Sequence, residues 1–218
     1  MNKYLALVLA MICLLCGCSK TTVVGMTTKT DKTPVTEAEK EEPAEVPEDA
    51  AELTGKVLVE IVVKNYGTIA VELDADAAPK TVTNFVKLAK EGFYDGLTFH
   101  RIMAGFMMQG GDPLGNGTGG SDEQIFGEFA ANGFENPLSH TRGAISMARA
   151  QNPNSASSQF FIVHEDSDFL DGQYAAFGYV TEGMDVVDAI CTEAKPVDNN
   201  GSIPADQQPV IESITVLE

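Results

Sequence analysis

The chain has 218 residues, with 32 acidic against 14 basic side chains and a formal net charge of −18 at pH 7. Nucleic acid is bound through clustered Lys and Arg, so this balance excludes a DNA- or RNA-binding surface as the main function. From residue 55 to residue 218 the excess persists, with 23 acidic against 9 basic residues. That excess also argues against this part lying directly on an anionic lipid surface. Residues 55–218 are numerous enough to form one domain with a buried core.

Residues 1–17 have the pattern of a signal peptide. Lys3 supplies the positive charge, and the apolar run 4–15 has the length of a signal core, short of the roughly 20 residues that span a bilayer. The sequence Leu15-Cys16-Gly17-Cys18 resembles a bacterial lipobox, which implies cleavage before Cys18 and attachment of lipid to its thiol. This reading predicts an extracytoplasmic protein anchored to the bacterial membrane only through Cys18. An ordinary secretory signal with incidental cysteines is the alternative.

Residues 18–54 are expected to form a disordered acidic tether. After Cys18 they contain nine acidic residues, four lysines and three prolines, and almost no large apolar side chains. Such a segment cannot offset the entropy cost of ordering. A docking site for a basic partner is the alternative reading. Beyond Cys18 the only cysteine is Cys191, so the sequence predicts no intrachain disulfide, no metal site and no cofactor.

Strand signals dominate the part from residue 55 onward. Pro79 is expected to begin a helix, with Val82, Phe85 and Ala89 on one face and Gly92 at its end. A second helix is expected at 184–190. Strands are expected at 57–63, 68–73, 97–102, 106–109, 144–148, 159–163, 175–180 and 210–217. Many short strands with two helices predict an antiparallel sheet closed on itself, with the helices covering its ends.

The stretch 99–112, FHRIMAGFMMQGGD, is the most informative in the chain. It is an apolar segment that nevertheless carries His100, Arg101 and Gln109. A guanidinium and an amide among large apolar side chains indicate a hydrophobic groove with a few fixed donors, suited to binding a peptide or ligand. His100 is expected to have a structural or orienting role, with general-base catalysis as the alternative.

This stretch closely resembles the signature of the cyclophilins, the cyclosporin-binding family of peptidyl-prolyl cis–trans isomerases. Five further blocks follow in the family's order: GNGTGG (115–120), AISMARA (144–150), SSQFFIV (157–163), FLDGQYAAFG (169–178) and EGMDVVDAI (182–190). The resemblance covers roughly residues 56–218. It implies a mainly β fold, a closed eight-stranded antiparallel β-barrel capped by two α-helices. The glycines of 115–120 also match a dinucleotide fingerprint, but the sequence after them lacks a helical apolar face, so a loop beside the groove is expected instead.

The resemblance also implies roles for individual residues. Arg101 matches the catalytic arginine and Gln109 the glutamine of the groove. Ala148 and Arg149 match a pair whose backbone contacts the bound peptide, although many members have asparagine at the second position. The expected walls of the proline pocket are Phe106, Met107, Phe161 and Leu170. Phe169 and Tyr174 complete the substrate-binding set, at positions where many members have tryptophan and histidine, and the first of these differences predicts weak cyclosporin binding.

Together these features predict a monomeric isomerase that acts on X-Pro bonds of exported or surface proteins and assists their folding. Its partners would be proline-containing peptides and unfolded exported proteins. The rival is a non-catalytic module that holds proline peptides at the end of a membrane tether. Retention of Arg101 beside an intact set of apolar wall residues favours the enzyme.

Overall fold

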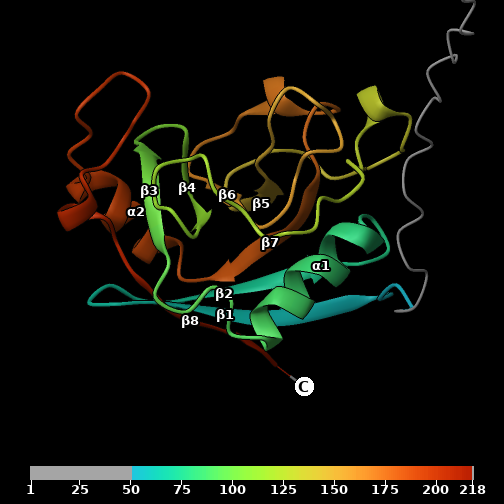
Figure 1. The fold of residues 1–218 in the computed structure, drawn as a ribbon, viewed down its shortest axis with the longest axis horizontal. Coiled ribbons are helices and arrows are strands. Elements are labelled where there is room, and N and C mark those ends of the chain that lie inside the picture. The colour runs from blue at the N-terminus through green and yellow to red at the C-terminus, as the bar shows by residue number, and fades with distance from the viewer. Residues whose placement is uncertain (1–50, 218) are drawn as a thin grey trace, which may run out of the picture. The chain divides into compact units, whose positions relative to one another are not determined.

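The computed structural model describes residues 51–217, so the predicted signal peptide, Cys18 and nearly all of the predicted tether lie outside the described residues. The described chain forms a mainly β fold with two α-helices (Figure 1). No helix within 51–217 is long and apolar enough to cross a membrane. The helices are α1 (Pro79–Lys90) and α2 (Met184–Glu193), and the strands are β1 (Lys56–Val63), β2 (Gly67–Asp74), β3 (Thr98–Met103), β4 (Met107–Asp112), β5 (Ala144–Met147), β6 (Phe160–Val163), β7 (Ala176–Glu182) and β8 (Ile211–Val216).

These strands form one antiparallel sheet in the order β3-β4-β6-β5-β7-β2-β1-β8. All eight expected strands and both expected helices are confirmed, with ends that shift by up to about three residues. Three short 3-10 helices, η1 (Ala130–Asn132), η2 (Asp168–Leu170) and η3 (Ala205–Gln207), lie in connections for which the sequence pattern predicted no element.

The expectation of a closed barrel overstates the pairing between β3 and β8, the strands at the two edges of the sheet. Within the described chain, β3 and β8 form no continuous ladder, and Thr98 and Val210 make a single isolated bridge. A few backbone hydrogen bonds reinforce it, including Ile211 N–H to Leu97 O at 2.8 Å. The sheet is therefore a strongly curled half-barrel with a narrow seam. Closure would need a longer stretch of paired residues than these two strand ends provide.

The main core follows from the two-residue period of the strands. In β1 and β2 alternate residues are buried, among them Val59, Ile61 and Val71. Helix α1 presents the buried ring of Phe85 to this core, where it meets Tyr94 at 5.1 Å and Phe160 at 5.4 Å between ring centroids. In Figure 1, α1 lies across β1, β2 and β8, while α2 lies apart from it; α1 contacts β8 and β2, and α2 contacts β2 and β4.

Strand β6 is buried on both faces and thereby creates a second apolar cluster. Phe160 and Ile162 point into the main core, whereas Phe161 and Val163 point the other way. We call this second group the outer cluster. Its buried members are Met107, Ala144, Phe161, Val163 and Leu170, and its half-buried members are Met103, Phe106, Ala148, Tyr174 and Tyr179.

Candidate active site

The outer cluster gathers most of the residues that the sequence predicted as walls of a proline pocket. Phe106, Met107, Phe161 and Leu170 all belong to it, together with Ala148 and Tyr174. They come from β4, β6, η2 and the connections around them, segments far apart in the sequence. Because Phe106, Ala148 and Tyr174 are only half-buried, the cluster remains partly exposed to solvent. The outer cluster is therefore a partly exposed apolar surface.

Phe169 lies at the edge of this surface. Its side chain is 68% exposed, and its ring centroid lies 5.6 Å from that of Phe106. Phe169 is thus placed to contact a ligand that extends beyond the wall residues. It is held by one aromatic neighbour and has no hydrogen-bonding group on its ring.

Arg101 and Gln109 face each other across paired strands beside the outer cluster. The two residues are register partners on β3 and β4. Arg101 Nη1 donates to Gln109 Oε1 at 3.1 Å, and Arg101 Nη2 lies 3.4 Å from Sδ of Met103, a cluster member. Arg101 Nε donates to the carbonyl oxygen of Asn200 at 2.7 Å. Since a guanidinium carries five N–H donors, two remain without a partner in the described contacts.

Burial lowers the pKa of Arg101, and the nearby Tyr174 and Asp198 act in the opposite direction. The ordinary pKa of an arginine lies far above neutral pH, so the side chain stays a cation there. The site therefore offers a permanent positive charge with free donors next to an apolar surface.

A glutamine that the sequence analysis missed, Gln159, extends the contact between Arg101 and Gln109. We call these three hydrogen-bonded side chains the polar line. Gln109 Nε2 donates to Gln159 Oε1 at 2.8 Å, and Gln159 Nε2 donates to the carbonyl of Gly119 at 2.7 Å. One N–H of the Gln109 amide is left free for a ligand carbonyl. The signal for Gln159 was its polar character in the otherwise apolar run QFFIV, directly before β6.

Gly119 belongs to the predicted glycine loop, which wraps around one carboxylate. Asp112 accepts hydrogen bonds from the backbone N–H groups of Leu114, Asn116 and Gly117 at 2.6–3.0 Å. Burial would raise the pKa of Asp112, but these hydrogen bonds outweigh it and hold the pKa below its usual range. The loop is therefore built around its own acidic side chain, and through Gly119 it borders the polar line at Gln159.

Arg149 has a different environment from the one a peptide-binding side chain would need. Its guanidinium lies over the rings of Tyr174 at 4.6 Å and Phe129 at 5.0 Å, and it donates to the carbonyl of Gln173 at 2.8 Å. The side chain therefore supports the wall at Tyr174. The backbone remains available, because the N–H of Arg149 and the carbonyl of Ala148 have no partner among the described residues, while Ala148 N–H donates to Gln159 O.

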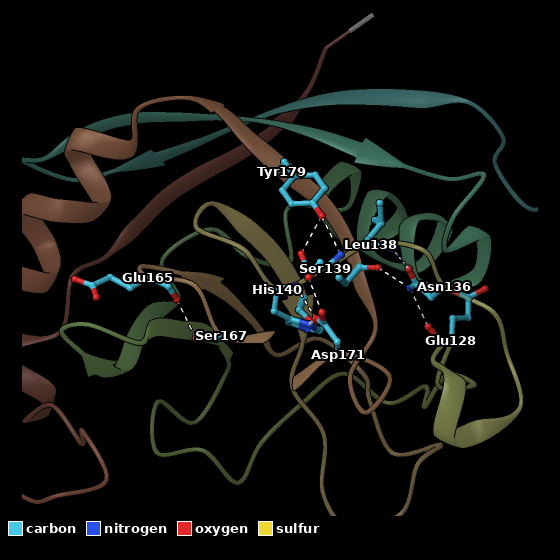
Figure 2. Close-up of polar contacts among 11 residues, drawn as sticks. Glu128, Asn136, Leu138, Ser139, His140, Glu165, Ser167, Asp171 and Tyr179 are labelled. Carbon is cyan, nitrogen blue, oxygen red and sulfur yellow. Dashed lines mark hydrogen bonds and ion pairs between the residues drawn. The ribbon is translucent and has the colours of Figure 1, made fainter. Parts of the chain in front are cut away.

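The sequence also did not reveal a polar group formed by His140, Asp171 and Ser146; Figure 2 draws its contact between His140 and Asp171. His140 is fully buried and stacks on Phe161, with ring centroids 6.0 Å apart. Its Nδ1 is 2.8 Å from Asp171 Oδ1, and its Nε2 is 3.0 Å from the hydroxyl of Ser146. The connectivity is that of a hydrolase triad, but Ser146 is fully buried inside β5, between Phe161 and Ala176. No substrate can reach that hydroxyl, so the group supports the wall and is not a nucleophilic site.

His100, beside Arg101 in the sequence, forms no hydrogen bond with the polar line. It is buried, and neither ring nitrogen has a hydrogen-bond partner in the described structure. Burial lowers its pKa. The structural role expected for His100 stays a prediction, with general-base catalysis as the alternative.

Comparisons with known proteins agree with this geometry. Residues 58–216 match the model of the family described as cyclophilin-type peptidyl-prolyl cis–trans isomerase/CLD. The chain belongs to the cyclophilin family. Its activity is that of the family, peptidyl-prolyl cis–trans isomerisation.

Individual cyclophilins support the assignment. A peptidyl-prolyl cis–trans isomerase of Helicobacter pylori is 51% identical over 128 residues, which cover 58% of this chain and 76% of that protein. Peptidyl-prolyl cis–trans isomerase B of Bacillus subtilis is 52% identical over 117 residues, 54% of this chain and 78% of that protein. A crystal structure of a Cryptosporidium parvum cyclophilin-type isomerase, determined in the presence of the dipeptide Ala-Pro, is similar with a TM-score of 0.65 and 31% identity, covering 74% of this chain and 99% of that one.

Proposed function

We propose that this cyclophilin isomerises X-Pro bonds in exported or surface proteins and so assists their folding, while a lipid on Cys18 holds it at the outer face of a bacterial membrane. The observation that carries the catalytic part is the position of Arg101. Its cationic side chain is fixed by Asn200 and Gln109 and keeps free donors beside the partly exposed outer cluster.

Prolyl isomerisation requires the site only to lower the barrier to rotation about one peptide bond. Rotation about a peptide bond faces a barrier of about 18–20 kcal/mol because it breaks amide resonance. In the twisted transition state the imide nitrogen becomes pyramidal and basic. A hydrogen bond from a free N–H of Arg101 to that nitrogen is stronger in the transition state than in either ground state, which is the condition for acceleration. No proton needs to be transferred.

The remaining residues bind and orient the substrate. The proline ring would lie on Phe106, Met107 and Phe161, while the free N–H of the Gln109 amide holds a carbonyl of the peptide. The unpartnered backbone groups of Ala148 and Arg149 would pair with the peptide backbone. Leu170 and Tyr174 complete the wall, and Phe169 contacts longer ligands.

Location and clients rest on the N-terminal sequence. The apolar run 4–15 followed by Leu15-Cys16-Gly17-Cys18 supports export and lipidation, and the acidic composition of 19–54 supports a spacer between membrane and domain. An enzyme held there meets chains that emerge from export before they have folded. Prolyl isomerisation is slow enough without catalysis, at about 10–100 s, to limit their folding.

The direct test is isomerase activity of the purified protein toward a short proline peptide, with a matched Arg101→Ala variant. Catalysis by the wild type and its loss in the variant would support the proposal. Binding of the peptide without turnover would replace it with the non-catalytic peptide-binding module. For the client role, refolding of an exported protein with a slow prolyl phase should accelerate in proportion to the enzyme added.

A further inference from the structure

The catalytic arginine is held from outside the sheet by a single loop. β3 is the end strand, and its free edge is covered by the segment that follows α2. Ile102 N–H donates to Gly201 O at 2.8 Å, and Ile203 N–H donates to the carbonyl of His100 at 2.9 Å. Between these bonds Arg101 and Ser202 form an isolated bridge. The segment therefore lies along β3 beside Arg101. It also supplies the Asn200 carbonyl that accepts a hydrogen bond from Arg101 Nε.

The shape of this loop depends on the side chain of Asp198. Its Oδ1 accepts hydrogen bonds from the backbone N–H groups of Asn200 at 2.9 Å and Ser202 at 3.0 Å. Val197 N–H donates to Ser202 O at 2.9 Å and closes the loop. One carboxylate oxygen thus fixes the residues on both sides of Gly201, and with them the direction of the Asn200 carbonyl.

The fit of the loop against β3 is tight at Gly201. This residue has φ +88°, and a Cβ there would come within 2.5 Å of Met103 Cγ and 2.8 Å of the carbonyl oxygen of Ile102. A side chain at this position would push the loop outward and carry Asn200 with it. The contact between Asn200 and Arg101 exists because the loop can approach this closely.

We propose that Asp198 is a positioning residue for catalysis: by holding the turn 198–202 it aims the Asn200 carbonyl at Nε of Arg101 and orients the free donors of that side chain toward the substrate. This rests on the proposed role of Arg101 as the catalytic donor. Asp198 itself is exposed and touches neither the outer cluster nor the substrate surface. Its effect on turnover passes through Arg101.

Two substitutions separate the hydrogen bonds from the charge. Asp198→Asn removes the charge but keeps the oxygen that accepts both N–H groups, whereas Asp198→Ala removes both. Because small misplacements of a catalytic group are costly, Asp198→Ala should lose at least about fivefold in kcat with KM within about twofold of wild type. Asp198→Asn should stay within about twofold of wild type. Asp122→Ala removes an exposed acid from the glycine-loop side of the site and should leave turnover unchanged.

The position of Arg101 can be followed directly through the NMR signal of its Nε–H, assigned by its loss in Arg101→Lys. In the wild type the bond to Asn200 should slow exchange of this proton with water. Asp198→Ala should speed that exchange and Asp198→Asn should not. A change in global stability alone would not move one side-chain proton in this selective way.

The outcomes separate the two proposals. If Arg101→Ala retains wild-type turnover, the catalytic role of Arg101 fails whatever Asp198 does. If Arg101→Ala is inactive but Asp198→Ala turns over like wild type, Asp198 does not position the arginine. An Asp198→Asn variant as impaired as Asp198→Ala would overturn the role of the turn, because the charge alone would then account for the loss.

Discussion

His140 and Asp171 connect two segments that contribute to the outer cluster. His140 Nδ1 lies 2.8 Å from Asp171 Oδ1, and the backbone N–H of His140 donates to the same oxygen at 2.7 Å. Asp171 directly follows Leu170, while the imidazole stacks on Phe161 from beneath. The pair therefore couples the segment that carries Leu170 to the strand that carries Phe161, and both of these residues belong to the outer cluster.

Removal of this link should destabilise the domain. His140→Ala leaves a cavity under Phe161 and takes the imidazole donor away from Asp171, so we expect a loss of about 2–4 kcal/mol in the free energy of unfolding. Urea denaturation at neutral pH measures it. Glu165→Ala is the matched control, because only the backbone carbonyl of Glu165 is used, by the hydroxyl of Ser167 (Figure 2). A His140→Ala variant as stable as that control would show that the contact between His140 and Asp171 does not contribute to the stability of the domain.

Stability should also fall as the pH drops below about 6.5. Burial lowers the pKa of His140 despite its hydrogen bond to Asp171, and burial likewise lowers that of His100. Between the folded and unfolded pKa values the unfolded chain binds protons that the folded chain does not bind. The contribution of the two neutral histidines to the free energy of unfolding is therefore complete above the unfolded pKa and is lost on acidification. Each histidine can change the free energy of unfolding by at most about 1.4 kcal/mol per pH unit.

The variant His100→Leu isolates one part of that slope. Neither nitrogen of His100 has a partner, so leucine removes buried polar atoms without breaking a hydrogen bond. Denaturation at several pH values should show equal or higher stability near pH 7 and a shallower fall toward about pH 5. An unchanged acid slope would mean that His100 is protonated equally in both states.

The sequence predicted local structure better than long-range contacts, for physical reasons. Alternation in the first two strands and the helical spacing around Phe85 are local signals, and all three elements were confirmed. The narrow seam between β3 and β8 was not foreseen, because it depends on how far the whole sheet curls. Arg101 and Gln109 could be chosen because one motif contains them. Asn200 is 99 positions from Arg101, and Asp171 is 31 from His140, so no local pattern links either pair.

Arg101→Ala should disable catalysis while the domain stays folded. The variant loses a charged hydrogen bond made mainly in the transition state, worth roughly 2–4 kcal/mol, so kcat/KM should fall by about 30-fold or more. Turnover of a proline peptide measures the loss, and circular dichroism checks the fold. Wild-type kcat/KM should be nearly flat between about pH 6 and 8, because no titrating group takes part. A bell-shaped profile would point instead to acid–base catalysis.

Cys18→Ala should release the protein from the membrane or leave an uncleaved precursor. One acyl chain holds a protein only marginally, whereas the diacylglyceryl group expected at Cys18 supplies two chains and stable attachment. Fractionation of cells that express either form measures membrane attachment, and mass spectrometry of the mature N-terminus detects the lipid. The matched control is Cys16→Ala, which changes a cysteine that is expected to leave with the signal. Wild-type protein found only in the soluble fraction and free of lipid would refute lipidation.

Phe169 should make this cyclophilin weakly sensitive to cyclosporin. In cyclophilins with tryptophan at this position the indole N–H can donate to a carbonyl of the drug, and the phenyl ring here keeps an exposed apolar face but has no donor. A drug carbonyl that loses water without gaining a partner costs about 1–3 kcal/mol, or roughly 5- to 150-fold in affinity. In the proposed mechanism a short proline peptide relies on Arg101, Gln109 and the outer cluster, so its turnover should suffer much less.

Phe169→Trp should therefore restore much of the inhibition while changing peptide turnover by less than about threefold. Because Phe169 is 68% exposed and its one aromatic neighbour in the described structure is Phe106, the larger ring can be accommodated without disturbing the core. Phe169→Leu is the matched control, since it alters the apolar contact without adding a donor and should gain no inhibition. Inhibition curves of the three proteins decide the point. Tight inhibition of the wild type, or equal gains in the tryptophan and leucine variants, would mean that the indole donor is not what the site lacks.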